Sequence, residues 1–149
     1  MSENKNIPST LDWVKVRSAC SIFQVFSELE LGVRQDVEHM QSLVKANQNI
    51  AFSFAKGSIR RFSVTRVDDP LMSIGESIYF DCTGKEISVS GETATGEKKM
   101  LVAELTLTND GECKLKVGDQ ELYQWQFRRM ALERLFFGPQ KVESRVVNL

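Results

Sequence analysis

The sequence predicts an α+β fold with a long N-terminal helix, an antiparallel meander sheet and a short C-terminal helix. Apolar residues first recur at every third or fourth position, then alternate with polar residues from about residue 50, and return to helical spacing near Trp125. Spacings of three and four follow one face of a helix, whereas a period of two follows one face of a strand. We expect a flexible N-terminus over residues 1–8, a single domain over 9–138 and a C-terminal tail over 139–149.

The N-terminal helix is expected to begin at Ser9, which offers an N-cap, and to end near Ala46. Its main apolar row consists of Ile22, Phe26, Leu29, Val33, Val37, Met40 and Val44. The row passes through Gly32, although glycine inside a helix costs about 1 kcal/mol relative to alanine. The row keeps its phase there, so we expect one helix that is bent or broken near Gly32.

The length of this helix raises a geometric problem. At 1.5 Å per residue it would be about 55 Å long, whereas a compact domain of this size is about 38 Å across. The helix must therefore bend or break near Gly32, or its free end must be covered by a second copy of the chain. Because the row stays apolar at Val37, Met40 and Val44, self-association through this helix is expected, and it can coexist with a bend.

Six short alternating runs separated by turn residues predict a six-stranded antiparallel meander. The strongest turn is Asn109–Gly111, which is typical of a hairpin. The pair Gly118 and Asp119 fits either another hairpin turn or the start of the last helix. That helix is expected from about Trp125, and Gly138 followed by Pro139 ends it. Both helices are expected on one face of the sheet.

The three cysteines, Cys20, Cys82 and Cys113, are odd in number and widely spaced, so no redox or zinc motif is present. Each lies in an apolar pattern, which fits small buried thiols in a reducing compartment. The first residues lack the apolar stretch of a secretory signal, and no run approaches the length of a membrane span. The sequence therefore predicts a cytoplasmic location without membrane contact.

The sequence favours a non-catalytic role over an enzymatic one, and it predicts no metal or cofactor. His39 is the single histidine, so a catalytic triad or Cys-His pair would have to use it. A lone histidine beside a helical apolar row is typical of a surface or boundary position. The neighbouring carboxylates Asp68 and Asp69 supply too few oxygen ligands for a metal ion.

Six residues are candidates for binding a partner or ligand, because arginine and tryptophan are common at binding surfaces. They are Arg60, Arg61, Arg66, Trp125, Arg128 and Arg129. Arginine beside aromatic residues can also hold single-stranded nucleic acid. The net charge of −1 gives no attractive field for nucleic acid, so that partner is not favoured.

These observations lead to two hypotheses about function. The first is an interaction or regulatory domain that forms a homodimer through the N-terminal helix or binds an unknown protein partner. The alternative is a small-molecule binding domain with an aromatic and arginine-lined cavity between sheet and helix. Such a cavity would suit a small apolar or anionic ligand.

Overall fold

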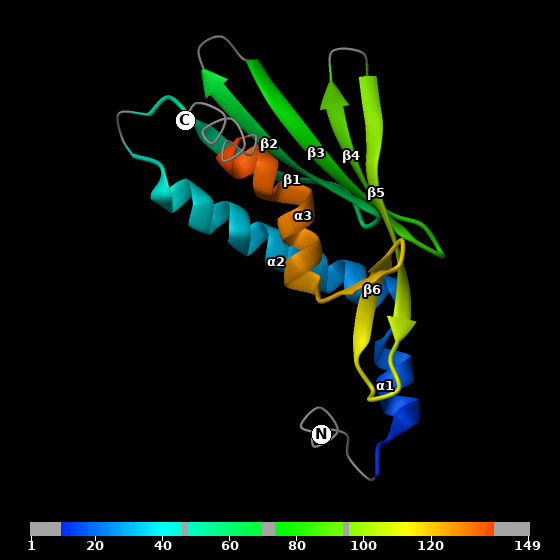
Figure 1. Ribbon diagram of the computed structural model, residues 1–149. Helices are drawn as coiled ribbons and strands as arrows, with labels where there is room; N and C mark the ends of the chain where they lie inside the picture. Colours follow the sequence, from blue (N-terminus) through cyan, green and yellow to red (C-terminus); the bar gives the residue numbers. More distant parts are fainter. Residues whose placement is uncertain (1–9, 46–47, 70–73, 94–95, 139–149) are drawn as a thin grey trace, which may run out of the picture.

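A computed structural model describes residues 10–45, 48–69, 74–93 and 96–138. Within these ranges the chain forms three helices and one seven-stranded antiparallel sheet (Figure 1), which confirms the α+β class. None of these helices combines the length and the hydropathy needed to cross a lipid bilayer. The expected flexible segment 1–8, the expected cap at Ser9 and the tail 139–149 lie outside the described residues.

The N-terminal helical region consists of two helices, α1 (Trp13–Ala19) and α2 (Ile22–Leu43). The expected break near Gly32 is wrong, because α2 runs unbroken through that residue and the break lies at Cys20 and Ser21. Ser21 adopts an extended conformation and its hydroxyl accepts a hydrogen bond from the backbone N–H of Gln24 at 3.2 Å. This N-cap starts a new helix. With 22 residues, α2 is about 33 Å long and fits the domain.

The sheet is a simple meander in which every strand pairs with its neighbours in sequence. The strands are β1 (Ala51–Ser58), β2 (Arg61–Asp69), β3 (Ile74–Cys82), β4 (Ile87–Thr93), β5 (Gly96–Leu107), β6 (Cys113–Val117) and β7 (Gln120–Leu122). The seventh strand arises because Gly118, with φ 59°, forms a hairpin turn, which decides between the two interpretations left open by the sequence.

Helices α2 and α3 (Gln124–Phe137) lie on the same face of the sheet (Figure 1). Four buried aromatic rings connect the layers. The ring centroids of Phe26 of α2 and Phe62 of β2 are 5.0 Å apart. The Phe62 ring also stacks on the Phe80 ring of β3, with the centroids 4.7 Å apart. The centroid of Phe80 lies in turn 6.5 Å from that of Phe127 of α3. This core fixes the relative positions of the two helices.

The short helix α1 lies against the arm that β6 and the end of β5 form (Figure 1). At the junction of α1 and α2, Cys20 forms a disulfide with Cys113 of β6, with the two Cα atoms 5.5 Å apart. The prediction of three reduced thiols is therefore wrong for this pair, because residues 93 positions apart in sequence meet in the fold. Cys82 is a buried free thiol, and burial raises its pKa.

Candidate functional site

An open hollow of about 390 Å³ lies between α2 and α3. We call it the α2–α3 groove. Its α2 wall consists of Asp36, His39, Met40 and Leu43, and its α3 wall consists of Trp125, Arg128, Arg129, Leu132, Glu133, Phe136 and Phe137. Both walls follow the three- and four-residue spacing of a helix face, so the groove is built from two regular rows of side chains.

Gly32 allows the two helices to approach where Arg128 crosses α2. A Cβ atom added to Gly32 would lie 2.7 Å from Nη1 and 2.9 Å from Cζ of Arg128. From this position the Arg128 Nε donates a hydrogen bond of 2.7 Å to Oδ2 of Asp36. Gly32 therefore makes room for an ion pair between the helices.

Two more polar contacts involve α3. Nε2 of Gln124 donates to Oε1 of Glu28 at 2.7 Å, which joins the start of α3 to α2. On α3 itself, Arg129 pairs with Glu133 at 3.2 Å. The charged side chains of the α2–α3 groove are therefore arranged as pairs of opposite sign.

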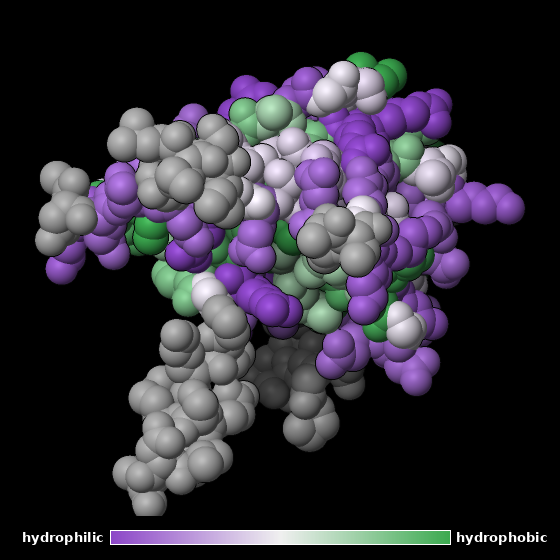
Figure 2. All heavy atoms as spheres, turned by 90° about the horizontal axis from the view of Figure 1, so that it is seen from above, coloured by the Kyte–Doolittle hydropathy of each residue, from purple (hydrophilic) through white to green (hydrophobic). Residues whose placement is uncertain are grey.

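Three large apolar side chains of the α2–α3 groove remain exposed. The exposed fractions are 59% for Leu43, 54% for Trp125 and 66% for Phe137. Figure 2 shows apolar side chains standing among hydrophilic ones on the face seen from above, without one continuous apolar patch. Exposed apolar side chains beside charged groups are typical of a protein interface.

The structure brings three of the six candidate residues together. Trp125, Arg128 and Arg129 all line the α2–α3 groove. Arg128 is largely covered and fixed by Asp36, whereas the Arg129 side chain is 64% exposed. Of the two arginines, Arg129 is therefore the one whose guanidinium is more accessible to a ligand.

The other three candidates lie outside the α2–α3 groove, and their side chains make different contacts. Arg60 lies in the turn between β1 and β2, with its guanidinium 5.0 Å from the ring centroid of Phe23. Arg66 extends from β2 towards α3, where its Nη1 donates a hydrogen bond of 2.9 Å to the Leu135 carbonyl. Positive groups near a helix C-terminus stabilise it, so Arg66 has a structural role in this position.

Arg61 belongs to a charged cluster on the sheet face opposite the helices. Its guanidinium bonds to Glu97 at 2.7 Å, lies 3.6 Å from Asp81 and stacks 4.2 Å above the ring of Tyr79. Burial raises the pKa of Asp81, and the charge of Arg61 offsets part of that rise. The hydrogen bond from Tyr79 to Glu92 raises the pKa of the Tyr79 phenol. Arg61 is therefore already paired with carboxylates.

Several residues of the α2–α3 groove are not among the candidates predicted from the sequence. On α2 these are Asp36, His39, Met40 and Leu43. Asp36, His39 and Leu43 are spaced by three and four and could have indicated a second row beside the core row that contains Met40, but such a row does not reveal which helix it faces. Over the described ranges, His, Cys, Asp and Glu side chains do not gather in threes as metal ligands would.

Comparison with protein-family models, with curated proteins and with solved structures finds no match. An open groove with aromatic, methionine and arginine side chains is suited to binding, because these residue types are enriched where proteins meet their partners.

Proposed function

We propose that the protein is a non-catalytic interaction domain that self-associates through the α2–α3 groove. The observation that carries this proposal is the exposure of Leu43, Trp125 and Phe137 along one groove. Covering large apolar side chains is the main favourable term in protein association. Trp125 and Phe137 are 12 residues apart on α3 and so stand about 18 Å apart along its axis, a span suited to a partner helix.

The charges of the α2–α3 groove favour a second copy as the partner. In a two-fold interface the same patch occurs on both sides, so it must complement itself. The groove carries both signs, with Asp36 and Glu133 beside Arg128 and Arg129. After a two-fold rotation, arginines of one copy can face carboxylates of the other. The α2–α3 groove is not electrostatically complementary to a partner that carries a strong charge of one sign.

Two leucines of α2 provide a matched test of self-association. Leu43 and Leu31 have almost equal exposed fractions, 59% and 58%, but only Leu43 lines the α2–α3 groove. In sedimentation equilibrium at tens of micromolar, we expect wild type and Leu31→Glu to be dimers and Leu43→Glu to be a monomer. A monomeric wild type, or equal behaviour of the two variants, would contradict the proposal.

The volume of the α2–α3 groove supports a second candidate function. A hollow of about 390 Å³ falls within the range of small-molecule sites. Apolar walls beside the exposed Arg129 would suit an amphiphile with a carboxylate head. In a thermal-shift screen with medium-chain fatty carboxylates, an increase in Tm that does not depend on protein concentration would favour this function over self-association.

The sequence predicts a cytoplasmic location, whereas the Cys20–Cys113 bond favours a different one. Disulfides persist mainly in oxidising compartments. Alkylation of the protein at the moment of cell lysis, followed by mass spectrometry, decides between the two locations. Labelling of both Cys20 and Cys113 supports the cytoplasm, and protection of both supports an oxidising compartment.

A further inference from the structure

Helix α1 is poorly supported by its own sequence. It has seven residues and none of them is buried. Trp13 and Val14 are 67% and 57% exposed. Isolated helices shorter than about 12–15 residues are marginal in water. An interaction outside α1 must therefore hold it in place.

Noncovalent contacts between α1 and the rest of the described chain are sparse. No hydrogen bond or ion pair joins Trp13–Ala19 to another described helix or strand, and the cap from Asp12 to the N–H of Lys15 is local. Just before the helix, the Leu11 side chain packs against Gly111. A Cβ atom added to Gly111 would lie 2.8 Å from Cδ2 of Leu11. An open hollow of about 540 Å³ is lined by α1, by Cys113 of β6 and by Gln124 at the start of α3. The packing beneath α1 is therefore loose.

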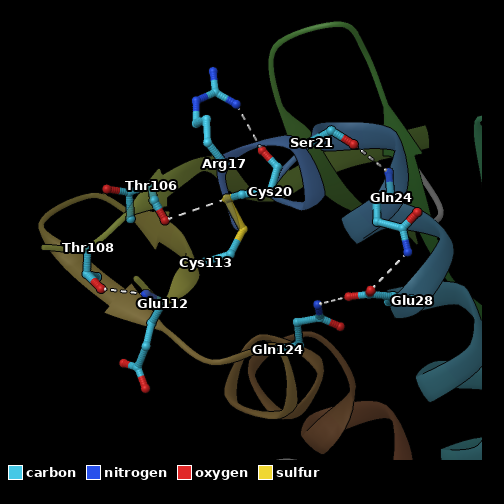
Figure 3. The surroundings of a disulfide bond; sticks show 10 residues. All are labelled: Arg17, Cys20, Ser21, Gln24, Glu28, Thr106, Thr108, Glu112, Cys113 and Gln124. Carbon is cyan, nitrogen blue, oxygen red and sulfur yellow. Dashed lines mark hydrogen bonds between the residues drawn. A yellow bond between two sulfur atoms is a disulfide. The ribbon is translucent and has the colours of Figure 1, made fainter. Parts of the chain in front are cut away.

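The disulfide attaches the chain at the point where α1 ends. Cys20 follows Ala19 directly and is only 5% exposed, and Cys113 is the first residue of β6. Figure 3 shows the bond between the helical junction and the strand, with Cys20 Sγ 4.0 Å from the Thr106 carbonyl oxygen. A second hollow of about 530 Å³ is lined by Arg17, Cys20 and Ser21 and by residues of β5. The covalent bond is therefore the principal link between α1 and the sheet.

We propose that the Cys20–Cys113 disulfide is a redox latch, and that a dithiol reductant releases α1 from β6. The reductant supplies two electrons and two protons. The sulfur–sulfur bond breaks, Cys20 and Cys113 become thiols, and the reductant becomes a disulfide. This inference does not depend on self-association through the α2–α3 groove.

Helix α2 stays in place after reduction, because its own apolar face is buried. Val25, Phe26, Leu29, Val33 and Val37 are all 5% exposed or less. Release of α1 opens the hollow that α1 lines together with Val25, Cys113 and Gln124. The reduced protein therefore presents a free N-terminal segment and a newly open face beside β6.

Hydrogen exchange measured by mass spectrometry tests the latch. The informative amides are those of Val16 and Cys20, which donate to the carbonyls of Asp12 and Val16, both at 3.1 Å. We compare oxidised wild type, wild type with dithiothreitol, and Cys113→Ser without reductant. Cys82→Ala is the matched control, because it removes the free thiol and leaves the latch intact.

We expect the α1 amides to exchange at least about tenfold faster in reduced wild type and in Cys113→Ser, with α2 unchanged. Oxidised wild type and Cys82→Ala should protect α1 equally. Unchanged exchange in α1 after reduction would show that packing holds the helix. Equal acceleration in α1, α2 and the sheet would show that the bond stabilises the whole domain. Either result overturns the latch, as does the finding of three free thiols in protein purified under air.

Discussion

Replacing Gly32 with alanine tests how α2 and α3 fit together. Alanine gains about 1 kcal/mol of helix propensity over glycine. The new methyl group would, however, lie 2.7 Å from Nη1 of Arg128, so the guanidinium must move, and we expect its 2.7 Å bond to Asp36 to be lost. A partly exposed charge-assisted hydrogen bond contributes about 1 kcal/mol. We therefore expect Gly32→Ala to leave the free energy of unfolding almost unchanged.

The same substitution should stabilise a protein in which Arg128 is already alanine. No guanidinium then lies over α2, so the full gain of about 1 kcal/mol should appear. Urea unfolding of wild type, both single variants and the double variant gives the coupling energy, which we expect to be about 1 kcal/mol. All four proteins must be at one concentration, because self-association would raise the apparent stability.

Arg129 provides the control for this cycle. It is the next residue on α3, its side chain is 64% exposed, and it pairs with Glu133 on its own helix. We expect Gly32→Ala and Arg129→Ala to be additive. If the coupling energy between positions 32 and 128 is as close to zero as that between positions 32 and 129, Gly32 has no role in positioning the Arg128–Asp36 ion pair, and our explanation of this glycine is refuted.

Three further predictions concern other parts of the fold. Arg66→Met should lower the free energy of unfolding by about 1 kcal/mol in urea, because the Leu135 carbonyl loses its 2.9 Å bond; no change would refute this role. Asp81→Asn should stabilise the fold at pH 7, because burial raises the pKa of Asp81 and the folded state therefore disfavours the charged form. The gain should shrink as the pH falls through the raised pKa towards the ordinary value of 3.8, and a gain that grows in acid would contradict it. Cys82 should resist iodoacetamide at pH 8 until the protein unfolds, because burial raises the pKa of its thiol; rapid labelling of the folded protein by mass spectrometry would disprove this.

The break between α1 and α2 shows a signal that could have been found in the sequence. Ser21 followed three residues later by Gln24 matches the start of a capping box. The apolar row keeps a helical period on both sides of this position, so periodicity alone favours one long helix. The cap hydrogen bond at Ser21 and the bond from Cys20 to Cys113 together end the first helix and start the second.

The α2–α3 groove was predicted only in part. Trp125, Arg128 and Arg129 stood out by residue type, and all three line the groove. The α2 wall was missed, because Leu43 and Leu31 look alike in sequence as apolar residues beside the core row. They differ only in whether α3 lies next to them. The interpretation of Gly32 failed for the same reason, since its neighbour Arg128 is far away in sequence.

The sequence by itself determined the α+β class, the meander and the buried face of α2. These features depend on short-range patterns, which are the period of the apolar residues and turn residues such as Gly111 and Gly138. Only the tertiary structure decided the Cys20–Cys113 bond, the need for glycine at position 32 and the second wall of the groove. Each of these depends on two segments that packing brings together, and no local pattern records which segments will meet.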